Sequence, residues 1–211
     1  FGQVESDDVI INFSANETFY PDKRPFFTEN QSLFDITGWD LRFINTRRIG
    51  GAPDKCSESN EAHLGECDSS ISDTSDINYA LRYTKEGQIN KYGFFMANED
   101  DSLFSEGRDY FAFRYKANLS KNSGKVGYLT TSVNRPSIDR KAMANVIDFD
   151  FKPSFASRLY GWAGEIDIKE KGIQKKGYGF KTNYTVRVTP ELFVLYFLNY
   201  SDENFDINDM G

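Results

Sequence analysis

The segment "GYGFKTNYTVRV", residues 177–188, decides the fold class because its side chains alternate between two kinds. Large apolar residues such as Tyr178, Phe180 and Tyr184 occupy alternate positions, and small or polar residues such as Lys181 stand between them. A period of two residues is typical of a β-strand whose two faces meet different surroundings. The segment therefore predicts a strand with one aromatic face and one polar face.

The same alternation recurs from residue 77 onward, and helical periodicity is absent. We predict eight strands at about 77–85, 90–98, 109–119, 125–133, 142–152, 157–169, 176–188 and 191–200. Two weaker strands precede them, at about 8–14 and 40–47. Short connections such as "TP" alternate with longer ones such as "EDDSLFSEGR" and "EKGIQK". This order favours an antiparallel up-and-down meander.

Two all-β architectures fit this pattern. In a transmembrane outer-membrane β-barrel the apolar face meets lipid, whereas in a soluble β-sandwich it packs on a second sheet. The predicted strands are long enough to cross a bilayer at a tilt. Aromatic residues such as Tyr160 and Trp162 lie near strand ends, as interfacial girdles require. We therefore favour part of a barrel, with the sandwich as the alternative.

In the barrel interpretation, the polar positions of the strands face the lumen. The predicted lumen-facing residues are Arg114, Lys116, Asp148, Asp150, Glu165, Asp167, Lys181 and Arg187. The apolar face then has the lipid bilayer as its partner, and the bacterial outer membrane is the expected location. Tyr178, Phe180, Tyr184 and Val186 are the lipid-facing residues expected on the strand that was quoted first.

The stretch "FYPDKRPFFTENQSLF", residues 19–34, combines aromatic and charged residues with two prolines, and we call it the aromatic knot. Pro21 and Pro25 disfavour both a helix and a central strand. We expect the knot to pack inside the barrel or at one mouth, as a hydrophobic anchor rather than a ligand site. Its expected packing and pairing residues are Phe19, Tyr20, Arg24, Phe26, Phe27, Glu29 and Phe34, with Arg24 and Glu29 paired to polar wall residues.

The chain divides into three parts. Residues 1–53 hold the knot and the first strands, as a plug or the start of a barrel, and residues 77–211 hold the barrel strands. Between them, residues 54–76 form an acidic loop with Cys56 and Cys67, for which we predict a disulfide in an oxidising compartment. A metal site that recruits His63 is the alternative, but it lacks a fourth ligand and CxxC spacing, so no metal is expected.

Charge and motifs exclude several function classes. The net charge of −7 argues against a nucleic-acid partner. The sequence has one histidine, no glycine-rich phosphate loop and no G-x-S-x-G elbow. A glycoside hydrolase would need two carboxylates, which Asp148, Asp150, Glu165 and Asp167 could offer, but thirty-two acidic residues make such pairs expected by chance. We predict no enzyme activity and no cofactor.

Several motifs are similar to those of one family. "FGQVESDDVIINFSANETFYPDKRPFFTENQSLFDI", "TRRIGGAP", "GYLTTSVNR" and "ENFDINDMG" resemble segments of an uncharacterised outer-membrane β-barrel family (a domain of unknown function) of Gram-negative bacteria. Its members usually carry an N-terminal carbohydrate-binding domain of the family-nine type. The chain departs from the family at Thr28-Glu29-Asn30 and in the cysteine-containing loop.

The resemblance implies that the chain is an internal fragment of the barrel part of such a protein. Its expected role is the passage or display of a ligand, linked to carbohydrate binding by the missing N-terminal domain, and a glycan is the expected ligand. The alternative is a soluble carbohydrate-binding β-sandwich in which Trp39 and Trp162 form a stacking platform.

Overall fold

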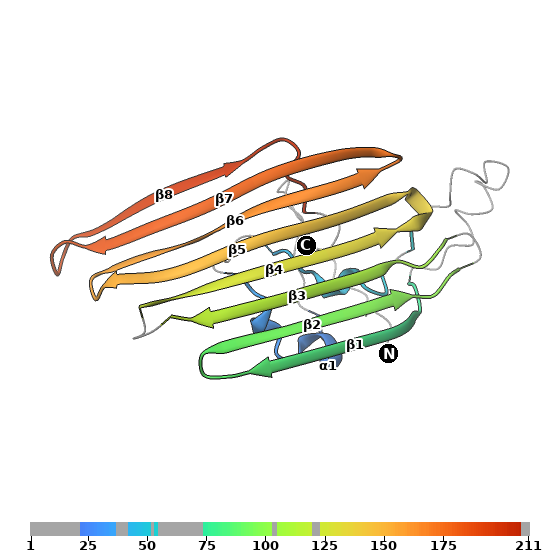
Figure 1. Ribbon diagram of the computed structural model, residues 1–211, viewed down its shortest axis with the longest axis horizontal. Coiled ribbons are helices and arrows are strands. Elements are labelled where there is room, and N and C mark those ends of the chain that lie inside the picture. The colour runs from blue at the N-terminus through green and yellow to red at the C-terminus, as the bar shows by residue number, and fades with distance from the viewer. Residues whose placement is uncertain are drawn as a thin grey trace, which may run out of the picture.

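The computed structural model describes residues 22–36, 42–51, 53–54, 74–102, 105–119 and 123–207. Within these residues, eight antiparallel strands form one sheet in which each strand pairs with its neighbours in sequence (Figure 1). The strands are β1 (Ile77–Glu86), β2 (Asn90–Glu99), β3 (Asp109–Asn118), β4 (Gly124–Arg135), β5 (Arg140–Ser154), β6 (Ser157–Glu170), β7 (Ile173–Arg187) and β8 (Phe193–Ser201). The predicted all-β meander is confirmed, and all eight strands lie where the alternation placed them.

The connections do not keep the predicted alternation of short and longer links, because the "TP" connection spans residues 188–192 and the link between β4 and β5 spans only residues 136–139. "EKGIQK" was expected to be a longer connection, but β6 and β7 are joined by Lys171 and Gly172 alone. Both residues have positive φ angles, 48° and 78°, which match the right-handed twist of a two-residue hairpin. A short 3-10 helix, η5 (Pro136–Ile138), joins β4 to β5, so only the connection between β2 and β3 is long at this end of the sheet.

The N-terminal part contains short helices and no strand within the described residues. The predicted strand at 40–47 is wrong in its described part, where Thr46–Arg48 form the 3-10 helix η2. In the knot, Pro25 opens the single helical turn α1 (Pro25–Thr28), followed by the 3-10 helix η1 (Gln31–Leu33). Proline is tolerated at a first helical position because its missing amide would have no partner there. The predicted strand at 8–14 lies outside the described residues.

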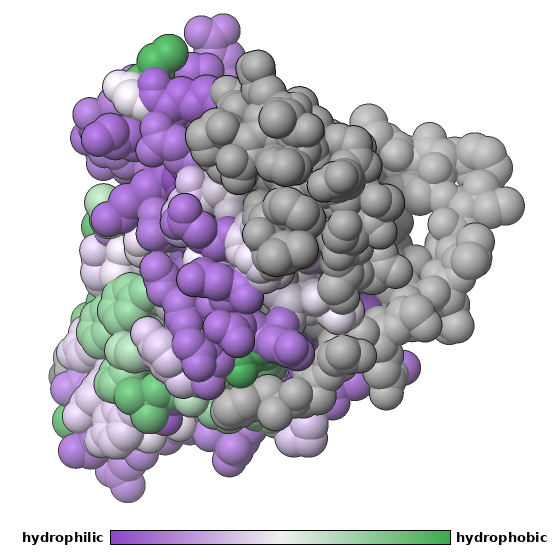
Figure 2. Space-filling model, turned by 90° about the vertical axis from the view of Figure 1, so that its right-hand side faces the viewer, coloured by the Kyte–Doolittle hydropathy of each residue, from purple (hydrophilic) through white to green (hydrophobic). Residues whose placement is uncertain are grey.

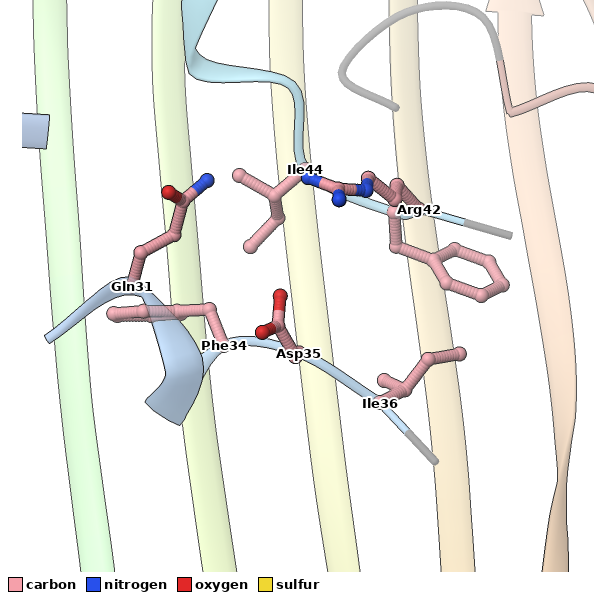
Figure 3. Close-up of a pocket in the computed structure, with 7 residues that line it drawn as sticks. Gln31, Phe34, Asp35, Ile36, Arg42 and Ile44 are labelled. Atoms are coloured by element: carbon pink, nitrogen blue, oxygen red, sulfur yellow. The ribbon is translucent and has the colours of Figure 1, made fainter. Parts of the chain in front are cut away.

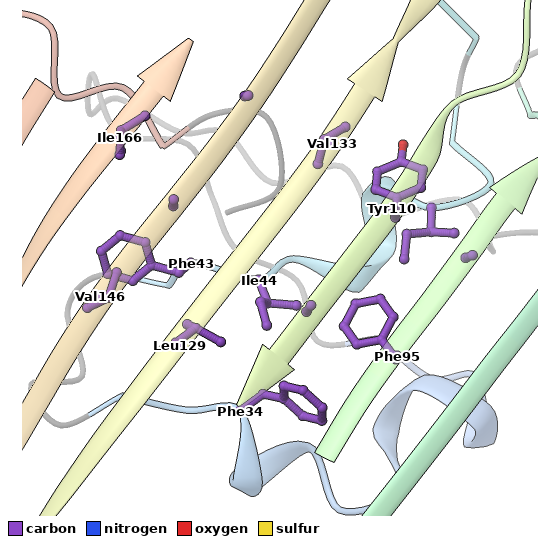
Figure 4. Packing of buried hydrophobic residues seen from close by; sticks show 14 of the residues in the cluster. Phe34, Phe43, Ile44, Phe95, Tyr110, Leu129, Val133, Val146 and Ile166 are labelled. Carbon is purple, nitrogen blue, oxygen red and sulfur yellow. The ribbon is translucent and has the colours of Figure 1, made fainter. Parts of the chain in front are cut away.

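One face of the sheet, which we call the covered face, packs against the knot and against residues 42–51, which we call the arginine segment. Its buried hydrophobic residues come from alternate strand positions: Phe95, Ala97, Tyr110, Ala112, Leu129, Val133, Ala142, Ala144, Val146, Trp162, Ile166 and Ile168. Phe27, Leu33, Phe34, Phe43, Ile44 and Ile49 complete this core from the N-terminal side. Figure 4 shows Phe34, Phe43 and Ile44 lying against the strands. The alanines on β2, β3 and β5 leave room for this close approach.

After β8 the chain turns back onto the covered face. The backbone amide of Asp202 donates to the carbonyl of Tyr178 at 3.0 Å. Phe205 then stacks on Trp162 with ring centroids 5.7 Å apart, and Phe43 meets Trp162 edge-on at 5.5 Å. The segment 202–207 and the arginine segment therefore cover the same part of the core, around Trp162.

The opposite side of the sheet, which we call the open face, carries large apolar side chains that no described segment covers. Phe180, Tyr184 and Val186 of β7 lie on this face, as expected from the sequence, and pair in register with Tyr200, Tyr196 and Val194 of β8. Tyr178 lies on the same face, beside the turn after β8. The covered face of β7 holds Lys181, Asn183 and Arg187 in the alternating positions.

The faces of β6 are the reverse of the prediction. Trp162 pairs with Asp148 and Ile168 pairs with Ala142, so both apolar residues point to the covered face. Glu165 and Asp167 consequently lie on the open face, not with the other predicted lumen-facing residues. Packing explains this orientation, because Trp162 and Ile166 fill the core beneath the arginine segment. Carboxylates placed there would lose their hydration, which is energetically unfavourable.

Candidate functional site: the covered face of the sheet

Arg24 holds the knot and the arginine segment together. Its Nε and Nη2 atoms donate to the two carboxylate oxygens of Asp22 at 3.0 and 2.7 Å. Nη1 donates to the carbonyl of Ile49 and Nη2 also donates to that of Thr46, both at 2.7 Å. The guanidinium also lies over the ring of Phe27, 4.3 Å from its centroid. Arg24 was expected to pair with the wall of the barrel, but its partners belong to the two covering segments.

The Asp22 carboxyl is buried and satisfied at the centre of this cluster. The Thr46 hydroxyl donates to it at 2.8 Å, and the backbone amide of Arg24 donates at 2.9 Å. Burial by itself raises the pKa of Asp22, but the hydrogen bonds from Arg24 and Thr46 outweigh burial and hold the pKa below its usual value.

We expect the Asp22 cluster to fail in acid. Because the folded-state pKa lies below the unfolded value of about 3.9, the carboxylate stabilises the fold at neutral pH, and this contribution is lost as the pH falls below about 4. The unfolding midpoint of the wild type should therefore fall more steeply between about pH 5 and 3 than that of Asp22→Asn, measured by denaturant titration. Glu29→Gln, which changes an exposed carboxylate of the knot, should retain the wild-type slope; equal slopes in all three proteins would contradict the assignment.

Basic residues of the strands attach the knot to the sheet by donating hydrogen bonds to its backbone carbonyls. Arg82 of β1 donates to the carbonyl of Phe26 at 2.8 Å, and Lys116 of β3 donates to that of Ser32 at 3.0 Å. Arg114 donates to the carbonyls of Leu33 and Asp35, each at 3.2 Å. These contacts satisfy carbonyls that the irregular knot backbone leaves without secondary-structure partners.

Arg114 also forms a fully buried ion pair with Asp148 of β5. Its Nη1 and Nη2 atoms donate to the two carboxylate oxygens at 2.6 and 2.9 Å, and the arginine side chain is 0% exposed. Gly127 of β4 lies between the partners, where an added Cβ would stand only 2.3 Å from Asp148 Oδ1. The bidentate geometry is the favourable form of an arginine–carboxylate contact, and it requires a glycine on the intervening strand.

A second buried cluster ties the arginine segment to the start of β3. Glu99 at the end of β2 accepts the amide of Gly50 at 2.7 Å and forms an ion pair with Arg108. Arg108 Nη2 donates to the carbonyl of Gly51 at 3.1 Å, and the Tyr110 hydroxyl donates to that of Arg48 at 3.3 Å. The φ angle of +79° at Gly50 is one that L side chains rarely adopt. The turn therefore depends on glycine.

The structure brings together most of the predicted site residues. Phe27 and Phe34 of the knot are buried against the sheet, whereas Glu29 is exposed and interacts electrostatically with Arg82 of β1. The predicted lumen-facing residues on the covered face are Arg114, Lys116, Asp148, Asp150, Lys181 and Arg187. Phe19 and Tyr20, and also Cys56, Cys67, His63 and Trp39, lie outside the described residues, so the disulfide stays a prediction.

Sequence reasoning missed Asp22, Glu99 and Arg108, which carry the buried clusters. Glu99 occupies a core-facing position of a strand whose alternate residues Phe95 and Ala97 are apolar. A carboxylate at such a position signals a buried partner. The sequence could therefore have identified Glu99 as a buried, paired carboxylate, but it could not have identified Arg108 as the partner.

The cavity between the knot and the arginine segment is small. Gln31, Phe34, Asp35, Ile36, Arg42, Phe43 and Ile44 surround about 130 Å³. Figure 3 shows Asp35 and Ile36 facing Ile44 and Arg42 across this cavity. Ligand pockets commonly measure about 300 to 1,000 Å³, so this cavity suits a few waters rather than a ligand. Among the described residues, no group of three or more His, Cys, Asp or Glu side chains is placed to hold a metal ion.

No helix within the described part of the chain is long and apolar enough to span a membrane. The comparisons with curated proteins and with solved structures found no match to the chain. Residues 1–84, which include the knot, the arginine segment and most of β1, match the family model described as a domain of unknown function (DUF5916).

Proposed function

We propose that the eight strands form part of the wall of a bacterial outer-membrane β-barrel that performs no chemistry and serves the passage or display of a ligand. The observation that carries this proposal is the open face. Its exposed large apolar residues are Tyr79, Leu81, Tyr83, Phe111, Tyr115, Tyr128, Met143, Ile147, Tyr178, Tyr196, Leu198 and Tyr200. Ile147 and Tyr196, at mid-strand positions, are 59% and 62% exposed. An apolar surface that spans a whole sheet marks contact with lipid or with another protein.

Most of the charged residues of the open face lie at one end of the sheet and Lys85 of β1 lies at the opposite end, which supports a lipid-facing band between polar rims. Lys176 of β7 lies 3.5 Å from Glu165 and from Asp167 of β6, and Gln174 donates to Asp167 at 2.8 Å. Figure 2 looks onto the molecule from this end, and hydrophilic residues cover most of the surface outside the grey region. Such rims are where barrel strands leave the hydrocarbon region.

One polar side chain within the apolar band has a partner on the neighbouring strand. Asn145 of β5 accepts a hydrogen bond from the Tyr128 hydroxyl at 2.8 Å. Strand lengths also suit the proposal, because they run from nine residues in β8 to fifteen in β5 and β7, and a tilted membrane strand needs about 9 to 11.

The contrast between the two faces favours a lumen on the covered side. Irregular backbone and buried ion pairs are tolerated at membrane depth only when protein or a water-filled cavity shields them from lipid. The knot, the Arg114–Asp148 pair and the Glu99–Arg108 pair all lie on the covered face, and the open face has no comparable cluster within the described residues. The resemblance of the motifs to a barrel family suggests a glycan as the ligand.

The first test is fractionation of the full-length protein. A barrel should sediment with outer membranes and need detergent for its extraction. Recovery as a monodisperse soluble protein would instead support the alternative, a soluble β-sandwich in which a second sheet covers the open face.

Cysteine labelling of β7 tests the orientation directly. In a variant without Cys56 and Cys67, we expect Phe180→Cys and Val186→Cys to react in whole membranes with an apolar maleimide and resist a charged one. Lys181→Cys and Arg187→Cys on the covered face should show the reverse. Equal reaction of both faces with the charged maleimide would contradict a lipid-facing assignment for this strand.

A further inference from the structure

The covered face has a groove that neither the knot nor the arginine segment lines. It measures about 790 Å³ and lies where β5 ends, β6 begins, β7 ends and β8 begins. Its lining residues are Ser123, Lys152, Ser154, Phe155, Ala156, Ser157, Arg158, Thr185, Arg187 and Phe193. The groove therefore lies at the end of the sheet with the 155–156 and 188–192 connections, on the left in Figure 1.

The charged residues that line the groove are all cations. Arg158 already binds the Asp150 carboxylate with two hydrogen bonds of 2.7 and 2.9 Å. The side chains of Lys152 and Arg187 form no hydrogen bond or ion pair with any other described residue, and both residues are exposed. The hydroxyl groups of Ser154 and Thr185 also line the groove, where Ser154 shares a hydrogen bond with Ser157 at 2.8 Å and Thr185 donates to the carbonyl of Arg158 at 3.4 Å. This is an excess of positive charge in a chain whose net charge is −7.

An apolar wall stands directly beside these cations. Arg187 pairs in register with Phe193, and Thr185 pairs with Leu195, so Phe193 and Leu195 share the covered face with Arg187 on the adjacent strand. Phe193 is 62% exposed and Leu195 is exposed as well. Neighbouring strands lie about 4.8 Å apart, so one small molecule can touch both strands at once.

We propose that this groove binds an amphiphilic anion, a small molecule with an apolar body and a carboxylate, sulfonate or phosphate group. The anionic group accepts hydrogen bonds from Lys152 and Arg187, and the apolar body lies on Phe193 and Leu195. Arginine suits such groups because its planar fork matches their oxygens. Charge complementarity selects anions over cations, and the apolar wall selects this class over simple inorganic anions. The inference concerns the covered face alone and does not require the open face to meet lipid.

Titration of the purified full-length protein with naphthalene-2-sulfonate tests the proposal, by calorimetry or by ligand-observed NMR. We expect saturable binding at one site. The double variant Lys152→Gln/Arg187→Gln should bind at least about tenfold more weakly, because two charge-assisted contacts are lost. Phe193→Ser, which keeps the cations, should also weaken binding several-fold.

The matched control is Lys141→Gln/Lys169→Gln, which removes the same charge from exposed positions of β5 and β6 on the open face. It should bind the sulfonate as the wild type does. Equal losses in the two double variants, or methanesulfonate binding as tightly as naphthalene-2-sulfonate, would overturn the proposal, because either result indicates a general response to net charge. All exchanged residues are exposed, so retained circular dichroism separates lost binding from lost fold. Fractionation as a soluble protein would end the barrel proposal but leave this test intact.

Discussion

Replacement of Arg114 by methionine is expected to lower the free energy of unfolding by about 3 to 5 kcal/mol. The substitution removes the bidentate partner of the Asp148 carboxylate, in a residue that is 4% exposed. It also removes the donors to the carbonyls of Leu33 and Asp35, so Lys116 is the β3 residue that still donates to the knot. Denaturant unfolding of the purified protein measures the loss.

Two further variants make this result specific. Arg187→Met removes the same group from an exposed position of the covered face and should cost less than about 1 kcal/mol. Gly127→Ala should also be destabilising, because the new Cβ would push apart Arg114 and Asp148. If Arg114→Met costs no more than Arg187→Met, the buried pair does not hold the knot on the sheet.

Trp162→Ala is expected to destabilise the protein by about 3 to 5 kcal/mol. The Trp162 side chain is 3% exposed and lies between Phe43 of the arginine segment and Phe205 of the returning chain. Its loss leaves a cavity at the point where three separate segments meet. Trp162→Phe should cost much less, because a ring still fills most of the space.

A comparison of two variants tests whether Trp162 lies in the core, as in the structure, or in an interfacial girdle, as the sequence predicted. Tyr178→Ala truncates an aromatic residue that is exposed on the open face, and we expect it to cost less than about 1 kcal/mol in detergent. Similar costs for Trp162→Ala and Tyr178→Ala would place both rings in similar surroundings and would contradict the assignment of Trp162 to the core.

For the knot, the sequence predicted the anchoring role but not the ionic contacts. Its aromatic and proline content predicted an anchoring segment, and the burial of Phe27 and Phe34 agrees with that. Its ionic partners were not predictable, because Arg24 could pair with any carboxylate that the fold brought near. In the structure it pairs with Asp22, two residues away, and with carbonyls of the arginine segment. The expected pairing of Arg24 with the strands was therefore wrong.

The sequence by itself determined the strands and their order, because alternation of side chains and tight turns are local properties of a chain. This holds for β7, whose aromatic and polar faces were both assigned correctly. For β6, period two separates the residues into two sets but does not say which set points inward. Register with β5 decides that, since pairing of Trp162 with Asp148 turns Glu165 to the open face. The pair Arg114–Asp148 joins residues 34 positions apart. Only the tertiary structure could bring them together, because their approach depends on the pairing of β3, β4 and β5 and on the space that Gly127 leaves between them.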